Sequence, residues 1–208
     1  SSPQLRWTIC NPMLWLYRIL FLPILILSSP FYLARMRKRG GYSENFNQRF
    51  GRIDALPEKS IQRKRIWLQA VSVGEMLAVE PMLQAWQADD SVEVYLTTTT
   101  STGYQLACER YRDLTIGIGY FPLDWAPFSA KAWKQVSADL AILTEGERWP
   151  EHIFQASKRG VPVVAVNARL SDRSFRRMMS LSALVRPLMR GITHVLACSP
   201  QDEERFRE

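Results

Sequence analysis

The 208-residue sequence lacks the residue clusters that bind metals or build disulfide frameworks. Its three cysteines, Cys10, Cys108 and Cys198, lie far apart, and its two histidines, His152 and His194, are isolated. No Cys-x-x-Cys pair or Cys/His cluster has the spacing of metal ligands. No G-x-G-x-x-G motif follows the first expected strand, so a dinucleotide site has little support. The sequence predicts a reduced, cytoplasmic body without a metal or a bound cofactor.

Acidic residues are scarce in the first third of the chain. Residues 1–65 contain twelve Lys and Arg against three Asp and Glu, whereas the remaining residues contain fifteen against seventeen. The net charge of +7 therefore belongs to the N-terminal segment. A nucleic-acid-binding protein usually spreads its basic residues over the binding face of the folded domain. We therefore expect no nucleic-acid partner.

An uncharged, apolar segment occupies residues 19–34 (ILFLPILILSSPFYLA), and a basic cluster follows at 35–39. The segment is shorter than the roughly 20 residues of a full membrane span. A longer span must include Arg18, which would have to snorkel to the headgroups, and we expect Pro23 and Pro30 to kink or end the helix. The sequence lacks the small-residue cleavage site of a signal peptide. A buried core hairpin stays open, but a membrane anchor or an in-plane membrane helix fits best.

From Ile66 onward, short apolar runs alternate with segments of helical periodicity. Such repeated units with Val- and Ile-rich strands predict a doubly wound α/β domain of Rossmann type, with a parallel sheet covered on both faces. We expect an anchor and basic flank at residues 1–40, a linker or domain start at 41–65, and the α/β domain at 66–208. The expected strands are residues 66–71, 92–97, 114–120, 139–143, 161–166 and 194–198.

Ligands of such sheets bind beyond the carboxyl ends of the strands, so the loops there are the candidate site. The loop after the first strand contains Ser72 and Glu75, which have the spacing of a helix capping box. The same Glu75 could instead serve as a general base at the mouth of the sheet. The residues alone leave both interpretations open.

Three further loops place polar groups at the same edge. Hydroxyl side chains fill residues 97–102, two carboxylates and a Trp lie within 144–150, and Asn, Arg and Ser lie within 167–174. Each loop has an ordinary interpretation as a helix cap, a solvated turn or a surface ion pair. Together they favour a polar, hydroxylated ligand that carries some negative charge.

The order and spacing of six motifs resemble the bacterial 3-deoxy-D-manno-octulosonic acid (Kdo) transferases. The resemblance covers nearly the whole chain from about Leu14. The motifs are R-F-G at residues 49–51, W-L-Q-A-V-S-V-G-E at 67–75, T-T-S-T-G at 99–103, E-G-E-R-W-P at 145–150, V-N-A-R-L-S at 166–171 and S-P-Q-D-E-E-R-F at 199–206.

The resemblance implies the N-terminal, acceptor-binding half of a two-domain glycosyltransferase of the GT-B fold. Such enzymes transfer Kdo from CMP-Kdo to a lipid A precursor in lipopolysaccharide synthesis, with inversion and without a metal, at the cytoplasmic face of the inner membrane. By this resemblance Glu75 is the base and Glu145 a second functional carboxylate. The residues expected to bind the acceptor are Ser72, Gly74, Thr100, Ser101, Thr102, Gly103, Glu147, Trp149, Asn167, Arg169 and Ser171.

Two positions depart from the family pattern. Arg148 stands where the family usually has an apolar residue, and Glu151 stands where it often has Asn. Because the family continues into a second domain that holds most of the CMP-sugar site, we expect little transfer by these 208 residues alone. Two alternatives stay open: another membrane-associated GT-B glycosyltransferase, such as a lipid A disaccharide synthase-like enzyme, or a non-catalytic membrane-anchored module that binds glycolipid.

Overall fold

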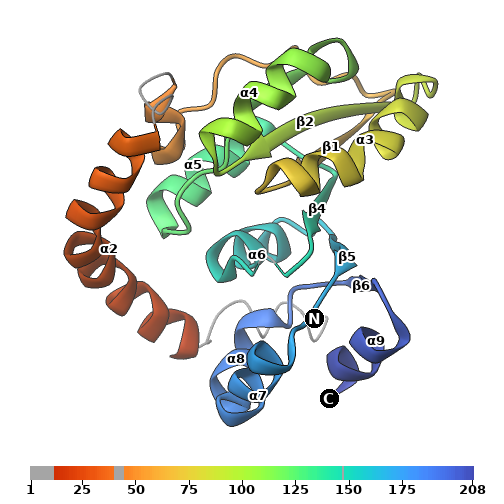
Figure 1. Ribbon diagram of the computed structural model, residues 1–208. Coiled ribbons are helices and arrows are strands. Elements are labelled where there is room, and N and C mark those ends of the chain that lie inside the picture. The colour runs from red at the N-terminus through yellow and green to blue at the C-terminus, as the bar shows by residue number, and fades with distance from the viewer. Residues whose placement is uncertain (1–11, 40–44, 147) are drawn as a thin grey trace.

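The computed structural model describes residues 12–39, 45–146 and 148–208 as one layered α/β unit with a long N-terminal helix along its flank (Figure 1). Six parallel strands form a single sheet in the order β3-β2-β1-β4-β5-β6. Their order reverses at β1 and β4, which is the switch point of a doubly wound fold. The predicted fold class is confirmed, and all six expected strands form with ends shifted by a few residues. They are β1 Lys64–Gln69, β2 Val92–Thr98, β3 Gly117–Tyr120, β4 Leu140–Thr144, β5 Val163–Ala168 and β6 His194–Ala197.

Helices cover both faces of the sheet because successive strand residues point to opposite sides. The helices are α3 Val73–Gln87, α4 Ser101–Arg110, α5 Ala126–Val136, α6 Pro150–Lys158, α7 Asp172–Ser180, α8 Ser182–Met189 and α9 Pro200–Arg207, with 3₁₀ turns η1 Phe46–Phe50 and η2 Arg112–Leu114. In β1, Trp67 packs into a core cluster with α5 and α6, whereas Ile66 and Leu68 pack into a second cluster with α3 and α4.

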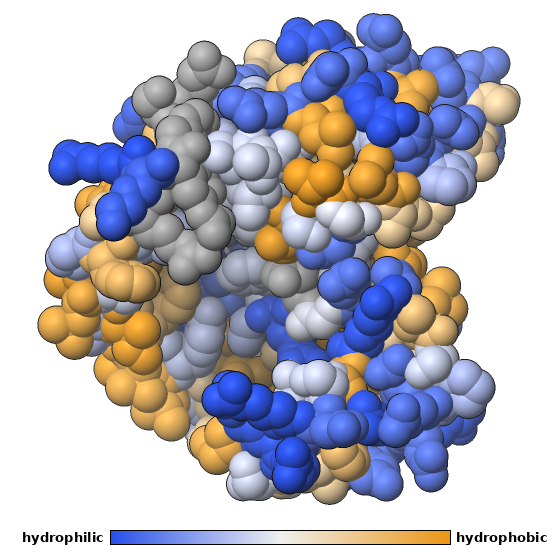
Figure 2. Space-filling view, viewed as in Figure 1, coloured by the Kyte–Doolittle hydropathy of each residue, from blue (hydrophilic) through white to orange (hydrophobic). Residues whose placement is uncertain are grey.

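The N-terminal apolar segment forms one helix, α2 Pro12–Arg39, which curves along the flank of the domain (Figure 1). Pro23 and Pro30 lie inside this helix and do not end it, so the expectation of a helix end at a proline is wrong. Residues 12–38 are long and apolar enough to cross a membrane by length and composition. Most of its apolar side chains are exposed, and they form a hydrophobic surface on this side of the molecule (Figure 2).

Candidate active site

Hydrogen bonds join the loops at the carboxyl edge of the sheet in pairs. The hydroxyls of Thr98 and Thr100 both donate to the Val71 carbonyl, at 3.0 and 2.8 Å, and so connect the loops after β1 and β2. The Glu145 N–H donates to the Val166 carbonyl at 2.9 Å and connects the loop after β4 to strand β5. The four loops singled out in the sequence therefore meet along one edge.

Glu75 lies in the first turn of α3 and is 5% exposed. Its carboxylate accepts hydrogen bonds from the Val71 N–H and the Ser72 hydroxyl, each at 3.0 Å, and from the Thr144 hydroxyl at the end of β4. The Ser72 hydroxyl in turn accepts from the Glu75 N–H at 3.2 Å, which caps the helix. The capping interpretation of this pair is confirmed. The contact with Thr144 also ties the loop after β1 to β4, which a cap does not require.

The Thr-rich loop is built around the N-terminus of α4. Thr100 is its N-cap and accepts from the Gly103 N–H at 3.1 Å. A Cβ at Gly103 would lie 2.7 Å from the Thr98 hydroxyl oxygen and 2.8 Å from that of Thr100. Any side chain there would displace these two groups, so the glycine is needed for this arrangement. Ser101 is buried, whereas Thr102 faces solvent.

An arginine outside the predicted site supports the same loop. Arg49 in η1 is buried, donates from Nη2 to the Thr99 carbonyl at 2.9 Å and lies 4.1 Å from the centre of the Tyr120 ring. Gly51, two residues on, has φ +72°, and a Cβ there would lie 2.3 Å from the Phe128 carbonyl oxygen. The R-F-G motif therefore serves to seat Arg49 beneath the Thr-rich loop.

Two predicted residues have left-handed backbone conformations. Glu145 has φ 53° and Asn167 has φ 51°, and Asn167 lies where the β5–β6 register shifts. Left-handed residues other than glycine and irregular strand pairing both recur next to functional sites. Both residues are half-buried, and Gly146 after Glu145 approaches the Arg169 carbonyl closely. Two of the four left-handed non-glycine residues in the described part of the chain thus lie in predicted loops; the other two are Asn45 and Ser137.

The other predicted residues either have structural roles of their own or are exposed. The Trp149 ring packs on Phe121, with ring centres 5.4 Å apart, so its stacking on a sugar stays a prediction. Ser171 is the N-cap of α7 and accepts from the Ser174 N–H at 3.3 Å. Arg169 and Gly74 are exposed. Glu147 lies outside the described residues.

A largely apolar cavity of about 290 Å³ opens beside Glu145. Arg148, Arg186 and Arg205 line its wall, together with the acidic residues Glu145 and Glu208. This cavity can hold an apolar group next to groups of both charges. The sequence does not predict this cavity, because its apolar side chains come from separate elements that meet only in the folded structure. Its apolar side chains include Leu170, Phe175, Met178, Met179, Val185, Met189 and Ile192.

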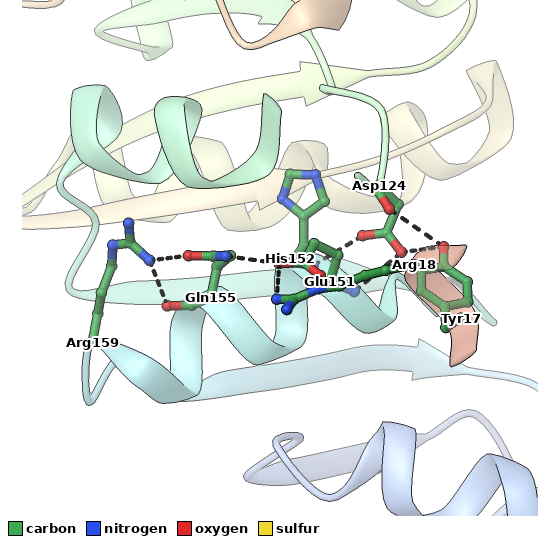
Figure 3. A network of polar contacts seen from close by, with 7 residues as sticks. All are labelled: Tyr17, Arg18, Asp124, Glu151, His152, Gln155 and Arg159. Carbon is green, nitrogen blue, oxygen red and sulfur yellow. Dashed lines mark hydrogen bonds and ion pairs between the residues drawn. The ribbon is translucent and has the colours of Figure 1, made fainter. Parts of the chain in front are cut away.

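A buried polar network that the sequence analysis also missed lies where α2 meets α6 (Figure 3). Arg18 pairs with Glu151, and the Tyr17 hydroxyl donates to Asp124. Burial raises the pKa of Asp124 to about 7 and lowers that of His152 to about 3. Two signals pointed here: the lone charge of Arg18 among apolar residues, and the departure of Glu151 from the family pattern. Among the described residues, no three His, Cys, Asp or Glu side chains gather as metal ligands.

The six-stranded parallel sheet and its strand order define a Rossmann-like α/β domain. Residues 44–208 match the family described as 3-deoxy-D-manno-octulosonic-acid transferase (kdotransferase), and the chain belongs to this family. It is 33% identical over 178 residues to 3-deoxy-D-manno-octulosonic acid transferase of Bordetella pertussis, covering 83% of this chain and 41% of that protein. It is 31% identical over 191 residues to the Haemophilus influenzae transferase of the same name, covering 91% and 40%.

The chain thus spans about two fifths of the length of these curated relatives. Among solved structures, it is similar to a UDP-N-acetylglucosamine 2-epimerase, with a TM-score of 0.49 and 11% identity over 70% of this chain and 44% of the other. The family resemblance inferred from the motifs is confirmed.

Proposed function

We propose that this chain forms the acceptor-binding half of an enzyme that transfers Kdo from CMP-Kdo to a lipid A precursor. The observation that carries the proposal is the hydrogen bond between Thr144 and Glu75. It joins the first turn of α3 to the end of β4, at the sheet edge where Glu145 follows Thr144 in the chain. A carboxylate beside hydroxyl groups suits a sugar acceptor.

In the proposed reaction, Glu75 takes the proton of the acceptor hydroxyl as its oxygen attacks the anomeric carbon of Kdo. The bond from that carbon to the CMP phosphate oxygen breaks, CMP leaves with the bonding electrons, and the configuration inverts. Of the three groups that donate to Glu75, the Ser72 hydroxyl is half-buried, whereas Thr144 is 2% exposed. The acceptor hydroxyl would therefore take the place of Ser72 at the carboxylate.

Glu145 has a supporting part in this proposal: its left-handed backbone directs the loop that receives the acceptor. Thr102, Arg169 and Asn167 are the exposed or half-buried polar groups available to sugar and phosphate oxygens. The apolar cavity beside Glu145 suits part of an acyl chain. Helix α2 would hold the domain at the cytoplasmic face of the inner membrane. Most contacts with CMP-Kdo would come from a second domain.

The test replaces Glu75 with Gln in a form of the protein that includes the donor-binding domain. We expect Kdo transfer to fall at least about 100-fold, the range for loss of a general base, while lipid acceptor binding and thermal stability are retained. The matched control is Glu109→Gln on exposed α4, which should transfer Kdo at the original rate. Unchanged turnover in Glu75→Gln would exclude it as the base. An unfolded variant would show that the cap is its main role, and Ser72→Ala then tests the cap separately.

The same assay separates the alternative enzymes. Transfer of a sugar from a UDP-linked donor, with no use of CMP-Kdo, would point to another glycosyltransferase of this fold. Tight glycolipid binding without transfer in the two-domain form would point to a binding module.

A further inference from the structure

Two polar contacts attach helix α2 to the α/β domain (Figure 3). Arg18 donates from Nε and Nη2 to the two carboxylate oxygens of Glu151, at 2.7 and 2.9 Å. The Glu151 side chain is fully buried and that of Arg18 is 16% exposed. The Tyr17 hydroxyl donates to Asp124 Oδ2 at 2.6 Å. A two-point pair of this kind fixes both the position and the orientation of the guanidinium group.

We call the Arg18–Glu151 and Tyr17–Asp124 contacts together the clamp. Its two acidic residues are held in place by α6. Asp124 accepts from the backbone N–H groups of Glu151 and His152, at 3.2 and 2.9 Å, in the first turn of α6. Gln155, one turn on, donates to Glu151 Oε1 at 2.7 Å. The clamp therefore connects α2 to a rigid element of the domain core and not to a surface loop.

The side chains of α2 separate into a covered and an exposed face. The covered face recurs every three or four residues from Met13 to Ser29, and Met36 is buried beyond an exposed stretch at residues 30–34. The buried or half-buried side chains are Met13, Leu14, Tyr17, Arg18, Phe21, Leu25, Ser29 and Met36. Most other side chains up to residue 34 are apolar and exposed, by 59% at Trp15, 66% at Ile19, 82% at Leu27 and 75% at Phe31. Figure 2 shows this hydrophobic surface on the outer side of α2.

A helix covered on one face from Met13 to Ser29, most of the length of a span, cannot cross a bilayer unless the domain enters the bilayer with it. The exposed face has the composition of an interfacial helix: large apolar and aromatic side chains, followed by exposed Arg37 and Lys38 that suit anionic headgroups. We propose that α2 lies in the plane of the membrane surface, held to the domain by the Arg18–Glu151 and Tyr17–Asp124 contacts, with both ends on the cytoplasmic side.

This inference rests on the membrane association proposed above and adds a consequence for the site. Helix α6 begins at Pro150, directly after the loop that carries Glu145. Because the clamp joins the membrane-facing helix to the first turn of α6, it fixes the height of the predicted acceptor loop above the lipid. Glu151, where the family often has Asn, would then be a positioning residue of this chain.

The test of orientation uses single cysteines at the two ends of α2, Pro12→Cys and Lys38→Cys, with all natural cysteines replaced by serine. The full-length protein is expressed in bacteria, and spheroplasts are treated with a membrane-impermeant maleimide. We expect both positions to stay unlabelled until the inner membrane is permeabilised. Labelling at one end alone in intact spheroplasts would overturn the proposal in favour of a span.

Flotation with phosphatidylethanolamine–phosphatidylglycerol vesicles tests the membrane association separately, and failure to float would reject that association itself.

The test of the clamp measures the rate at which a maleimide labels the cysteine of Phe21→Cys, on the covered face of α2, in the vesicle-bound protein. Arg18→Glu or Glu151→Arg alone should raise its labelling rate at least tenfold, and the double reversal should lower it again. Arg63→Glu breaks the exposed pair with Asp90 and is the matched control, which should leave the rate unchanged. Equal rates in the single reversals and the original protein would exclude the clamp. Labelling in the double reversal as fast as in the single ones would also count against a specific pair.

Discussion

Asp124 is the residue at which pH should act on stability. Burial raises its pKa to about 7, in spite of hydrogen bonds from Tyr17, His152 and Glu151, and the Glu151 carboxylate raises it further. In the unfolded chain its pKa is about 3.9, so the folded protein binds the proton more tightly. The stability that this group contributes is complete below about pH 4 and is lost as the pH rises to about 7.

Asp124→Asn should remove this dependence, because the amide does not titrate. At roughly 1.4 kcal/mol per pKa unit, the original protein should lose up to about 4 kcal/mol between pH 4 and 7 relative to the variant. His152, with its pKa lowered to about 3 by burial, has the opposite effect, because its protonation in the unfolded chain makes stability rise with pH up to about 6.5; both proteins share this effect, so it cancels in the comparison. Urea unfolding of both proteins across the range measures the difference. If the free energy of unfolding changed with pH in the same way in both proteins, Asp124 would not be the titrating group.

Glu145 offers a second test at a single residue, because its φ of 53° is unfavourable for any side chain with a Cβ. Glu145→Gly should be more stable than Glu145→Ala by about 1 kcal/mol, since only glycine adopts this conformation freely. Both variants should lose Kdo transfer if the carboxylate positions the acceptor. Chemical unfolding and a transfer assay on the two-domain protein measure the two effects. Equal stability of the two variants would mean that the loop relaxes when the side chain is removed.

At the scale of elements, the strands were predictable because each is a short apolar run between turn residues, and buried parallel strands require that composition. The caps at Ser72 and Thr100 were equally local, since they depend on side chains three residues apart. The sequence predicted a kink or an end at the prolines of α2, and the helix continues through both, because a local rule considers only the loss within the helix itself. The contacts of Arg18 and Tyr17 with residues more than 100 positions away stabilise the helix, and no local pattern contains them.

The candidate site was likewise predictable only in those features that depend on local sequence or on strand order. The motifs placed Glu75, Glu145 and the Thr-rich loop at one edge because parallel strands bring their carboxyl ends together. They did not reveal that Thr144 bonds Glu75, that Arg49 supports the Thr-rich loop, or that a cavity lies beside Glu145. These features depend on side chains from different elements meeting in space. Family patterns named the residues, and only the packing shows which of them also have a structural role.

For the molecule as a whole, the clamp implies that α2 belongs to the folded domain and is more than a removable tether. Deleting residues 1–39 should abolish flotation with vesicles, since the exposed apolar face is lost. The same deletion leaves Glu151 without Arg18 and exposes the surface of α8 that α2 contacts, so the melting temperature should fall by several degrees. Adding Glu151→Gln to the truncated protein removes the unpaired charge and should recover part of that loss. Thermal unfolding and flotation of the three proteins measure these effects. An unchanged melting temperature after deletion would show that α2 does not stabilise the domain, and continued flotation would reveal a second membrane-binding surface.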